Sequence, residues 1–326
     1  MSTIEMIWAA RQRISSHIRR TPIMSSPFLD ELAGRRVYIK PECLQHTGSF
    51  KYRGARSALS ALDPRIRKKG VLAYSSGNHA QGIALAAREF GVPAVIVMPA
   101  DAPVPKVENT RSHGAEVLLY DRVGGESREK IGNRLQAELG LSLIRPFDEP
   151  LVIAGQGTTG LEIAEQIAAE RIETADVLVC CGGGGLTSGI ALALEAEAPG
   201  LRARPCEPVG FDDVRRSLES GTITANEQFS GSICDAIVTI SPGQITFPIM
   251  KRLCGPGLVA SEDECLYAMA QAFRHLKLVA EPGGAAALAA ALFRQDEIEG
   301  EAVICLITGG NVEAEMFRSA LEKHGI

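Results

Sequence analysis

Lys51 lies in a segment where a lysine side chain can act as a nucleophile. It follows the pair Gly48-Ser49 and stands at the expected first turn of a helix. The positive end of a helix disfavours the ammonium form of a lysine and favours the neutral amine. A neutral amine can attack an aldehyde and hold it as a Schiff base. The alternative is a solvated surface lysine, because most lysines are exposed.

A run of glycines offers a binding place for an anion. It follows the apolar residues 177–179, precedes an Ala/Leu-rich helical stretch and consists of Gly182, Gly183, Gly184 and Gly185. A strand, a glycine run and a helix in this order point backbone N–H groups at a phosphate. No glycine stands three places beyond either G-x-G pair, and the Gly-Lys-Ser/Thr ending of a P-loop is missing. A plain turn between a strand and a helix is the alternative.

Two further loops carry polar residues at the ends of expected strands. The loop that begins at Ser75 precedes a helix expected from Ala80 to Phe90, and its small residues can offer N–H groups to a carboxylate. Asn78 in this loop can hydrogen-bond to a ring hydroxyl. Thr308 ends a late apolar strand, where its hydroxyl can face a pyridine nitrogen. Taken alone, the first loop reads as a helix N-cap and the second as a turn.

Together the four segments resemble the fold type II pyridoxal phosphate enzymes, and more narrowly the threonine/serine dehydratases (ammonia-lyases) and serine racemases. The Ser-Phe-Lys-x-Arg-Gly-Ala, Ser-Gly-Asn-His, tetraglycine and Thr-Gly-Gly-Asn elements occur in the order of the family. The resemblance runs from about Ile4 to the C-terminus. It implies pyridoxal 5'-phosphate as the cofactor and an α/β fold similar to the tryptophan synthase β chain, with two parallel-type open sheets flanked by helices.

The resemblance also implies roles for single residues. Lys51, beside Phe50, would hold the cofactor and remove the α-proton of the substrate. The glycine loop would bind the phosphate, Asn78 the ring hydroxyl, and Thr308, where the family usually has serine, the pyridine nitrogen. The loop that would bind the substrate carboxylate comprises Ser75, Ser76, Gly77, Asn78 and His79.

Ser76 matches the family position on the face opposite the lysine. With Lys51 and Ser76 on opposite faces, both transfers of the α-proton become possible, so Ser76 is a second candidate catalytic residue and racemisation a candidate activity. An N-cap without a role in proton transfer is the alternative for Ser76.

Residues 207–213 resemble the divalent-cation loop of serine racemases and some dehydratases. Glu207 and Asp213 would supply carboxylate oxygens and Phe211 its carbonyl, which are the ligands that Mg²⁺ or Ca²⁺ requires. The alternative is a set of solvated acids, with Asp212 or Asp213 capping the next helix.

The identity of residue 308 favours one reaction. A neutral hydroxyl does not keep the pyridine nitrogen protonated, so expulsion of a β-substituent is favoured over a long-lived carbanion. We therefore expect β-elimination of water from L-threonine or L-serine, which gives a 2-oxo acid and ammonia. The alternatives are a serine racemase, a hydroxyaspartate or hydroxyectoine-pathway dehydratase of the same fold and, from a different class, a non-catalytic amino-acid sensor.

From Lys51 onward, apolar runs of strand length alternate with helical stretches, which predicts parallel sheets with helices on both faces. The pattern restarts after Pro150. We expect a large cofactor-binding domain formed by residues 1–65 and 147–326 and a small, mobile domain formed by residues 66–146. Because the sequence ends soon after the Thr308 segment, we expect no C-terminal regulatory domain.

The bulk composition is that of a soluble globular protein. The 326 residues are 45% apolar and 22% charged, and a net charge of −5 gives no general attraction for nucleic acid or an anionic membrane. The N-terminus lacks the pattern of a secretory signal, and the eight cysteines form no C-x-x-C pair. We expect a cytoplasmic homodimer that binds a small amino-acid substrate, and neither nucleic acid nor a membrane.

Overall fold

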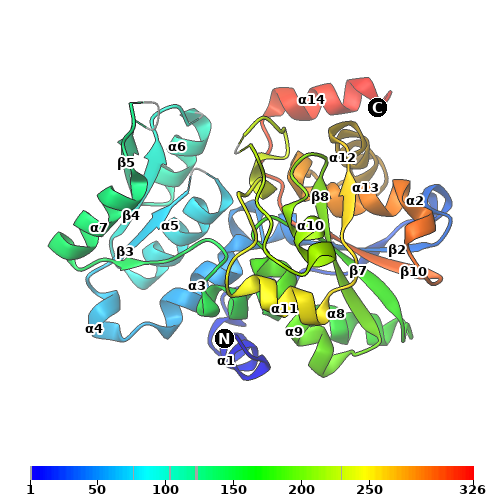
Figure 1. Ribbon diagram of the computed structural model, residues 1–326, viewed down its shortest axis with the longest axis horizontal. Coiled ribbons are helices and arrows are strands. Elements are labelled where there is room, and N and C mark those ends of the chain that lie inside the picture. Colours follow the sequence, from blue (N-terminus) through cyan, green and yellow to red (C-terminus); the bar gives the residue numbers. More distant parts are fainter. Residues whose placement is uncertain (1, 76, 103, 122–123, 229) are drawn as a thin grey trace.

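Two mostly parallel β-sheets organise the part of the chain that the computed structural model describes, which is residues 2–75, 77–102, 104–121, 124–228 and 230–326. The larger sheet has the strand order β1-β2-β10-β7-β8-β9, in which β1 alone among the described strands runs antiparallel to its neighbour. The smaller sheet has the order β5-β4-β3-β6 and is parallel throughout these strands. The predicted fold class is therefore confirmed (Figure 1).

The strands are short, as is usual for parallel sheets with helical crossovers. Their bounds are β1 (Met24–Ser25), β2 (Arg36–Pro41), β3 (Val71–Tyr74), β4 (Ala94–Pro99), β5 (Glu116–Tyr120), β6 (Ser142–Leu143), β7 (Ala175–Cys180), β8 (Leu201–Pro208), β9 (Leu258–Ala260) and β10 (Ala302–Ile307). Every residue of β7 and β10 is buried, because helices cover both faces of the larger sheet.

Helices connect these strands. Their bounds are α1 (Ile4–Ile14), α2 (Pro27–Ala33), α3 (Lys51–Ala61), α4 (Pro64–Arg67), α5 (Asn78–Phe90), α6 (Val104–Ser112), α7 (Arg128–Leu139), α8 (Pro150–Ala169), α9 (Gly185–Glu197), α10 (Asp213–Ser220), α11 (Thr246–Leu253), α12 (Glu262–Leu276), α13 (Ala286–Phe293) and α14 (Ala314–Lys323), with short 3-10 turns η1 (Glu42–Leu44), η2 (His46–Gly48), η3 (Asp235–Ile237), η4 (Pro282–Gly284) and η5 (Gln295–Glu297). No helix within the described ranges is long and apolar enough to cross a membrane.

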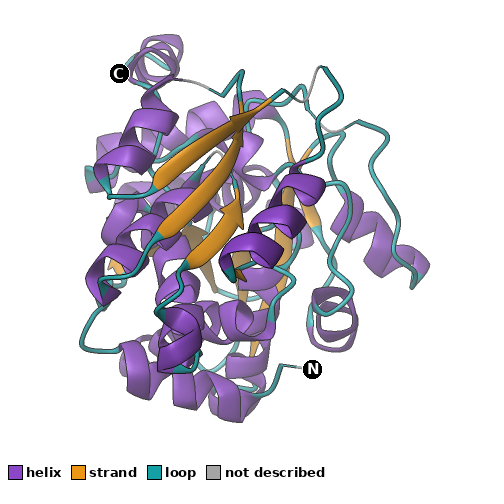
Figure 2. Cartoon of the chain, turned by 90° about the vertical axis from the view of Figure 1, so that its left-hand side faces the viewer, coloured by secondary structure: helices purple, strands orange, loops and turns teal. Residues whose placement is uncertain are grey.

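Each sheet has its own apolar core. In the larger lobe, α8 and α9 pack on one face of the sheet, and α2, α12 and α13 pack on the other. In the smaller lobe, α5 packs on one face of the sheet and α7 on the other. Figure 2 shows this side of the molecule, with helices packed around the strands. Because the smaller sheet uses only residues 71–143, we propose the expected division into domains 1–65 plus 147–326 and 66–146.

The strand order gathers distant loops at one edge of the larger sheet. β10, the last strand in sequence, lies between β2 and β7, and these three strands run parallel. Their carboxyl ends therefore meet at the same edge, which is where ligands bind in open α/β sheets. The segments that leave this edge contain Glu42 after β2, Cys181 after β7 and Thr308 after β10.

Candidate active site

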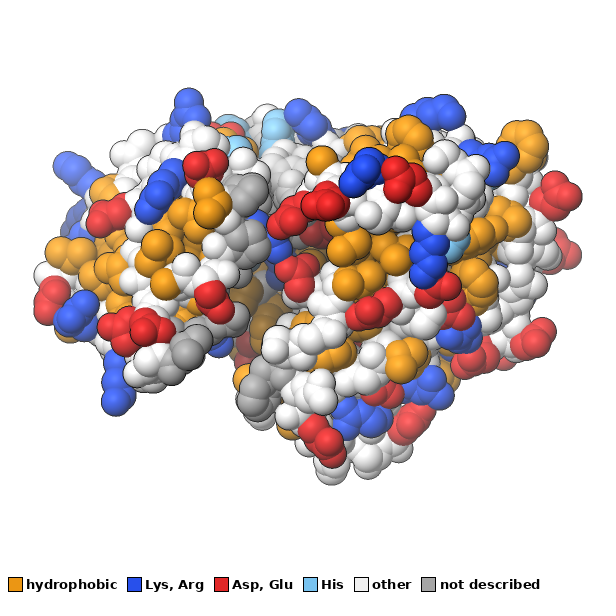
Figure 3. Space-filling model, turned by 90° about the horizontal axis from the view of Figure 1, so that it is seen from above, with side chains coloured by type: hydrophobic (Ala, Val, Ile, Leu, Met, Phe, Trp, Pro, Cys, Tyr) orange, Lys and Arg blue, Asp and Glu red, His pale blue; other side chains and the backbone are white. Residues whose placement is uncertain are grey.

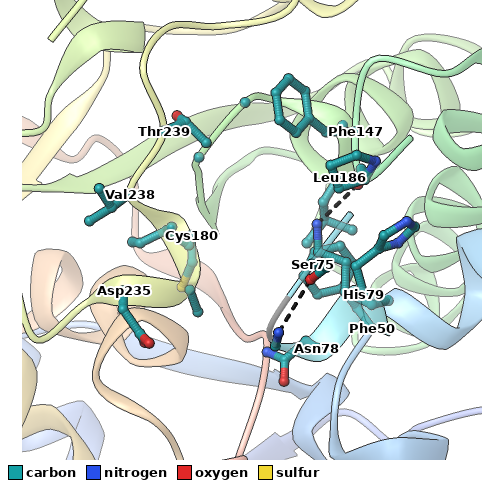
Figure 4. A pocket seen from close by; sticks show the side chains of 18 of the residues that line it. Phe50, Ser75, Asn78, His79, Phe147, Cys180, Leu186, Asp235, Val238 and Thr239 are labelled. Carbon is teal, nitrogen blue, oxygen red and sulfur yellow. Dashed lines mark hydrogen bonds between the residues drawn. The ribbon is translucent and has the colours of Figure 1, made fainter. Parts of the chain in front are cut away.

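A cavity of about 1210 Å³ lies between the two lobes, and residues of both lobes line it. From above, the surface is hollowed at this place (Figure 3). Figure 4 shows labelled side chains on two sides of the cavity: Phe50, Ser75, His79 and Phe147 on one, and Cys180, Asp235, Val238 and Thr239 on the other. The lining includes residues from each of the Lys51, Ser75, glycine and Thr308 loops, so the structure brings the predicted segments together.

Lys51 is the first residue of α3, as its position after the Gly-Ser turn predicts. It lines the cavity, and its Nζ lies deep inside and donates a hydrogen bond to the Pro146 carbonyl at 3.0 Å. Burial lowers the pKa of Lys51 to about 8, against the opposing charge of Glu281. Burial is therefore the main cause of the lowered lysine pKa, whereas the position at a helix start was the only cause that the sequence indicated.

The glycine loop follows β7 and leads into α9, as predicted. Gly184 has a φ of +89°, and a Cβ on Gly183 would lie 2.3 Å from the Phe147 ring. Side chains are therefore excluded, and the loop presents bare backbone to the cavity. In the described structure no hydrogen bond uses the N–H groups of residues 182–185 as donors. Such free donors at a helix start fit a phosphate group.

The loop after β3 forms the opposite wall. The helix α5 begins at Asn78 rather than at Ala80, so Asn78 and His79 lie in its first turn. The Gly77 N–H donates to the Ser75 Oγ at 3.2 Å. The predicted residue Ser76 lies outside the described residues.

His79 is buried against the small lobe. Its Nε2 lies 3.0 Å from the Ile144 carbonyl, which can only accept, so Nε2 carries the hydrogen. Burial, together with the charge of Lys51, lowers the pKa of His79 to about 3. The neutral His79 side chain therefore holds the loop in place. The predicted contact of His79 with the substrate would then be made by its backbone N–H.

Thr308 lies immediately after β10, only 3% exposed. Its carbonyl accepts from the Phe50 N–H at 3.1 Å, which joins the start of α3 to the end of the sheet. Thr308 is not among the described residues that line the cavity; its hydroxyl lies near the Cys180 thiol, which does line it, and lowers the pKa of that thiol against the larger effect of burial. Burial raises the pKa of Cys180 to about 11, so both groups are neutral near pH 7.

Sequence reasoning gave no role to two polar residues on the cavity wall, Glu281 and Asn311. Glu281 accepts from the Asn78 Nδ2 at 2.6 Å, and Asn311 donates to the Asn78 Oδ1 at 2.7 Å. Burial raises the pKa of Glu281 to about 7. The sequence did contain a signal for both residues, because Glu281 begins the Glu-Pro-Gly-Gly segment and Asn311 ends the Thr-Gly-Gly-Asn segment.

The predicted cation loop lies at the end of β8. Glu207 is fully buried, and its carboxylate accepts from the N–H groups of Val214 and Arg215 at 2.9 and 2.7 Å. Glu207, and not the N-cap residue Asp212, therefore caps α10. Burial raises the pKa of Glu207 well above its usual value, and the charge of Asp213 adds to this effect.

Asp213 has one satisfied and one unsatisfied oxygen. Its Oδ1 accepts from the Asn226 Nδ2 at 2.6 Å, while its Oδ2 is buried without a partner in the described structure. Two adjoining buried carboxylates and an orphaned oxygen fit a hard cation. The described residues contain no group of three His, Cys, Asp or Glu side chains that could hold a metal. The predicted cation site therefore stays a prediction, in which the Phe211 carbonyl would be the third ligand.

A buried amine, a bare glycine loop at a helix start and neutral groups at the sheet edge define a site for an aldehyde cofactor that carries a phosphate. The sequence model of the family described as "Pyridoxal-phosphate dependent enzyme" matches residues 14–309, and the chain belongs to this family. Pyridoxal phosphate is therefore its cofactor, as predicted.

Relatives cover nearly the whole chain. L-threo-3-hydroxyaspartate ammonia-lyase from Pseudomonas sp is 42% identical over 322 residues, which are 99% of both chains. Serine racemase from Oryza sativa subsp. indica is 38% identical over 325 residues, 98% of this chain and 94% of the relative. A solved structure of T.th. threonine deaminase is similar with a TM-score of 0.89 at 43% identity, covering 95% of this chain and 99% of that one. These relatives confirm the resemblance to ammonia-lyases and racemases and differ in the reaction that their names state.

Proposed function

We propose that the protein eliminates water from the β-hydroxy amino acids L-threonine and L-serine, and that the released product hydrolyses to a 2-oxo acid and ammonia. The observation that carries the proposal is the meeting, in one cavity, of the buried Lys51 amine and the N–H groups of the glycine loop, which have no acceptor among the described residues. The neutral Thr308 and Cys180 at the sheet edge support elimination over a long-lived carbanion.

Bound pyridoxal phosphate supplies an electron sink that weakens the bonds to the substrate α-carbon. Lys51 would remove the α-proton at its Nζ, because a pKa near 8 leaves part of the amine neutral at physiological pH. The loop from Ser75 to His79 would hold the substrate carboxylate at the N-terminus of α5. Phe50 and Phe147 would keep water from the reacting atoms.

The test is a substrate panel on the purified protein. L- and D-serine, L- and D-threonine and 3-hydroxyaspartate are supplied to the wild type and to Lys51→Ala, and 2-oxo acid formation is followed. We expect turnover of L-threonine and L-serine that is lost in Lys51→Ala. A protein that lacks the visible absorbance of lysine-bound cofactor would instead be a sensor, and this outcome would refute the proposal.

A second candidate substrate is L-threo-3-hydroxyaspartate. Lys106 and Arg128 line the cavity from the small lobe, and Lys106 pairs with Asp235 across the cleft at 2.5 Å. A second carboxylate on the substrate can replace Asp235 as the partner of Lys106. Relatives from Pseudomonas sp and Saccharomyces cerevisiae are named for this reaction. If this candidate is right, Lys106→Met raises the KM for 3-hydroxyaspartate and leaves that for L-serine unchanged.

Racemisation is tested at Ser76. Serine racemase and dehydratase rates are compared in Ser76→Ala, and equal loss of both rates would remove the proposal of two proton-transferring faces.

We further propose that Glu207, Phe211 and Asp213 bind Mg²⁺ or Ca²⁺, that the chain forms a homodimer and that it acts in the cytoplasm.

A further inference from the structure

Three polar side chains on the cavity wall form a continuous chain of hydrogen bonds. The Asn78 Nδ2 donates to the Glu281 Oε1 at 2.6 Å, and the Asn311 Nδ2 donates to the Asn78 Oδ1 at 2.7 Å. The same Asn311 nitrogen donates its other hydrogen to the Thr47 carbonyl at 2.8 Å. The chain joins η4, α5 and the end of β10, so it fixes Asn78 from both sides.

Glycines make room for this chain. A Cβ on Gly309 would lie 1.9 Å from the Glu281 Oε1, and a Cβ on Gly48 would lie 2.6 Å from the Asn311 Oδ1. Gly48 also has a φ of +71°, which favours glycine. Gly309 thus leaves the space that Glu281 occupies, and Gly48 leaves the space that Asn311 occupies, which indicates that the positions of both side chains matter to the site.

The chain determines which way the Asn78 amide points. The Asn311 Nδ2 is fixed as a donor by the Thr47 carbonyl, which can only accept. Asn78 therefore turns its carbonyl to Asn311 and its NH₂ group to Glu281. A flipped Asn78 would place its carbonyl against the carboxylate and its NH₂ group against another NH₂ group. One hydrogen of the Asn78 NH₂ group is used by Glu281, and no acceptor among the described residues uses the other, which is available to a ligand.

We propose that Glu281 is a positioning residue that, through Asn78, directs an amide N–H at the hydroxyl oxygen of the cofactor ring. The proposal rests on the proposed placement of the ring beside Asn78. Asn311 completes the arrangement from the other side.

The charges around Glu281 leave its carboxyl group partly ionised near pH 7. Glu281 is 6% exposed, and burial raises its pKa to about 7, while the hydrogen bond from Asn78 lowers it. Asp235 raises it further, whereas the charges of Lys106 and Lys51 lower it. The cations that face the cavity thus counteract burial.

The test is a double-mutant cycle on the dissociation constant of pyridoxal phosphate, measured by its release from diluted holoenzyme. Glu281→Ala and Asn78→Ala should each raise the constant roughly tenfold, because each removes one charge-assisted contact or its donor. If Glu281 acts through Asn78, the dissociation constant of the double variant should be at most about twice that of Asn78→Ala. If the two single effects instead multiply, so that the double variant binds roughly a hundredfold more weakly than the wild type, the proposal is overturned.

Further variants separate positioning from a general structural role. Glu281→Gln keeps an acceptor and should stay within about threefold of the wild type, whereas a loss equal to that of Glu281→Ala would contradict the proposal. Asn311→Asp replaces the donor by an acceptor and should weaken binding roughly tenfold; an unchanged constant would count against the chain. Glu313→Gln is the matched control, because Glu313 lines the same cavity and in the described structure makes no hydrogen bond with Asn78.

The visible spectrum gives a second readout. Glu281→Ala and Asn78→Ala should shift the absorption of the bound cofactor in the same direction, because both leave the ring oxygen without its donor. Wild-type spectra in both variants would overturn the proposal. If the wild type itself holds no pyridoxal phosphate at Lys51, the proposed function fails; if it does and the cycle is multiplicative, only the role of Glu281 fails.

Discussion

Arg53 lies two residues after Lys51 on α3, and its side chain is completely buried. It donates to both oxygens of Glu42 at 2.7 and 2.8 Å and to both oxygens of Glu162 at 2.7 and 2.9 Å. Lys40, which is also buried, donates to Glu162 at 2.7 Å. Two buried cations therefore balance two carboxylates, and the network ties the helix that carries Lys51 to β2 and α8.

Replacement of Arg53 by methionine should destabilise the protein strongly. Burial alone would lower the pKa of Arg53, but the charges of Glu42 and Glu162 outweigh burial and raise it. In the same way, burial alone would raise the pKa of Glu42, but the charge of Arg53 lowers it. The variant leaves Glu42 without its cation in a site closed to water. Removal of one partner from a buried pair costs about 3–5 kcal/mol, and we expect this loss in the free energy of unfolding.

The assay is urea-induced unfolding followed by circular dichroism. Arg11→Met is the matched control, because the ion pair of Arg11 with Glu165 is about half exposed and should contribute less than about 1 kcal/mol. Addition of Glu42→Gln to Arg53→Met should restore part of the loss, since it removes the uncompensated charge. If Arg53→Met were no less stable than Arg11→Met, the account of a balanced network would be wrong.

Three other predictions concern the cofactor and the cation. Lys51→Ala should lose the visible absorbance of the wild type and its reaction with borohydride, as checked by spectroscopy and peptide mapping. Gly183→Ala should weaken pyridoxal phosphate binding at least about tenfold, and Phe147→Ala should partly restore it, because the new Cβ would meet the Phe147 ring at 2.3 Å. Mg²⁺ or Ca²⁺ at about a hundred times its dissociation constant should raise the melting temperature by about 5 °C in the wild type and not in Asp213→Asn; equal shifts would exclude the loop as the site.

Local sequence patterns were sufficient for the main parts of the fold and the site. Alternating apolar runs and helical stretches predicted both parallel sheets, because fully buried strands such as β7 and β10 read as uninterrupted apolar segments. Lys51 at a helix start and the glycine loop between a strand and a helix were recognisable because both features lie within about ten consecutive residues. The start of α5 was placed two residues late, since Asn78 and His79 look like capping residues rather than a first helical turn.

Side chains that act across the fold could not be predicted in this way. Glu281 and Asn311 meet Asn78 from positions more than 200 residues away in sequence, and only the placement of β10 brings them together. The role of Glu207 in capping α10 was missed for a similar reason, because a residue inside a strand is an unusual cap for the helix that follows. The contacts of Asn78 have no short sequence spacing, and the contacts of Glu207, although only seven and eight residues long, follow no known capping pattern.

The strand order also explains why Lys51 is a poised amine. The Phe50 N–H bonds to the Thr308 carbonyl at 3.1 Å, and Ser49 pairs with Gly309, so the end of β10 fixes the first turn of α3. β10 is the last strand of the chain, and Pro146, which accepts from the Lys51 Nζ, lies where the chain returns from the small lobe. The burial that lowers the lysine pKa therefore exists only when both lobes and the final strand are in place. A helix start alone would therefore not make the Lys51 amine reactive; its burial by the end of β10 and by the segment at Pro146 would.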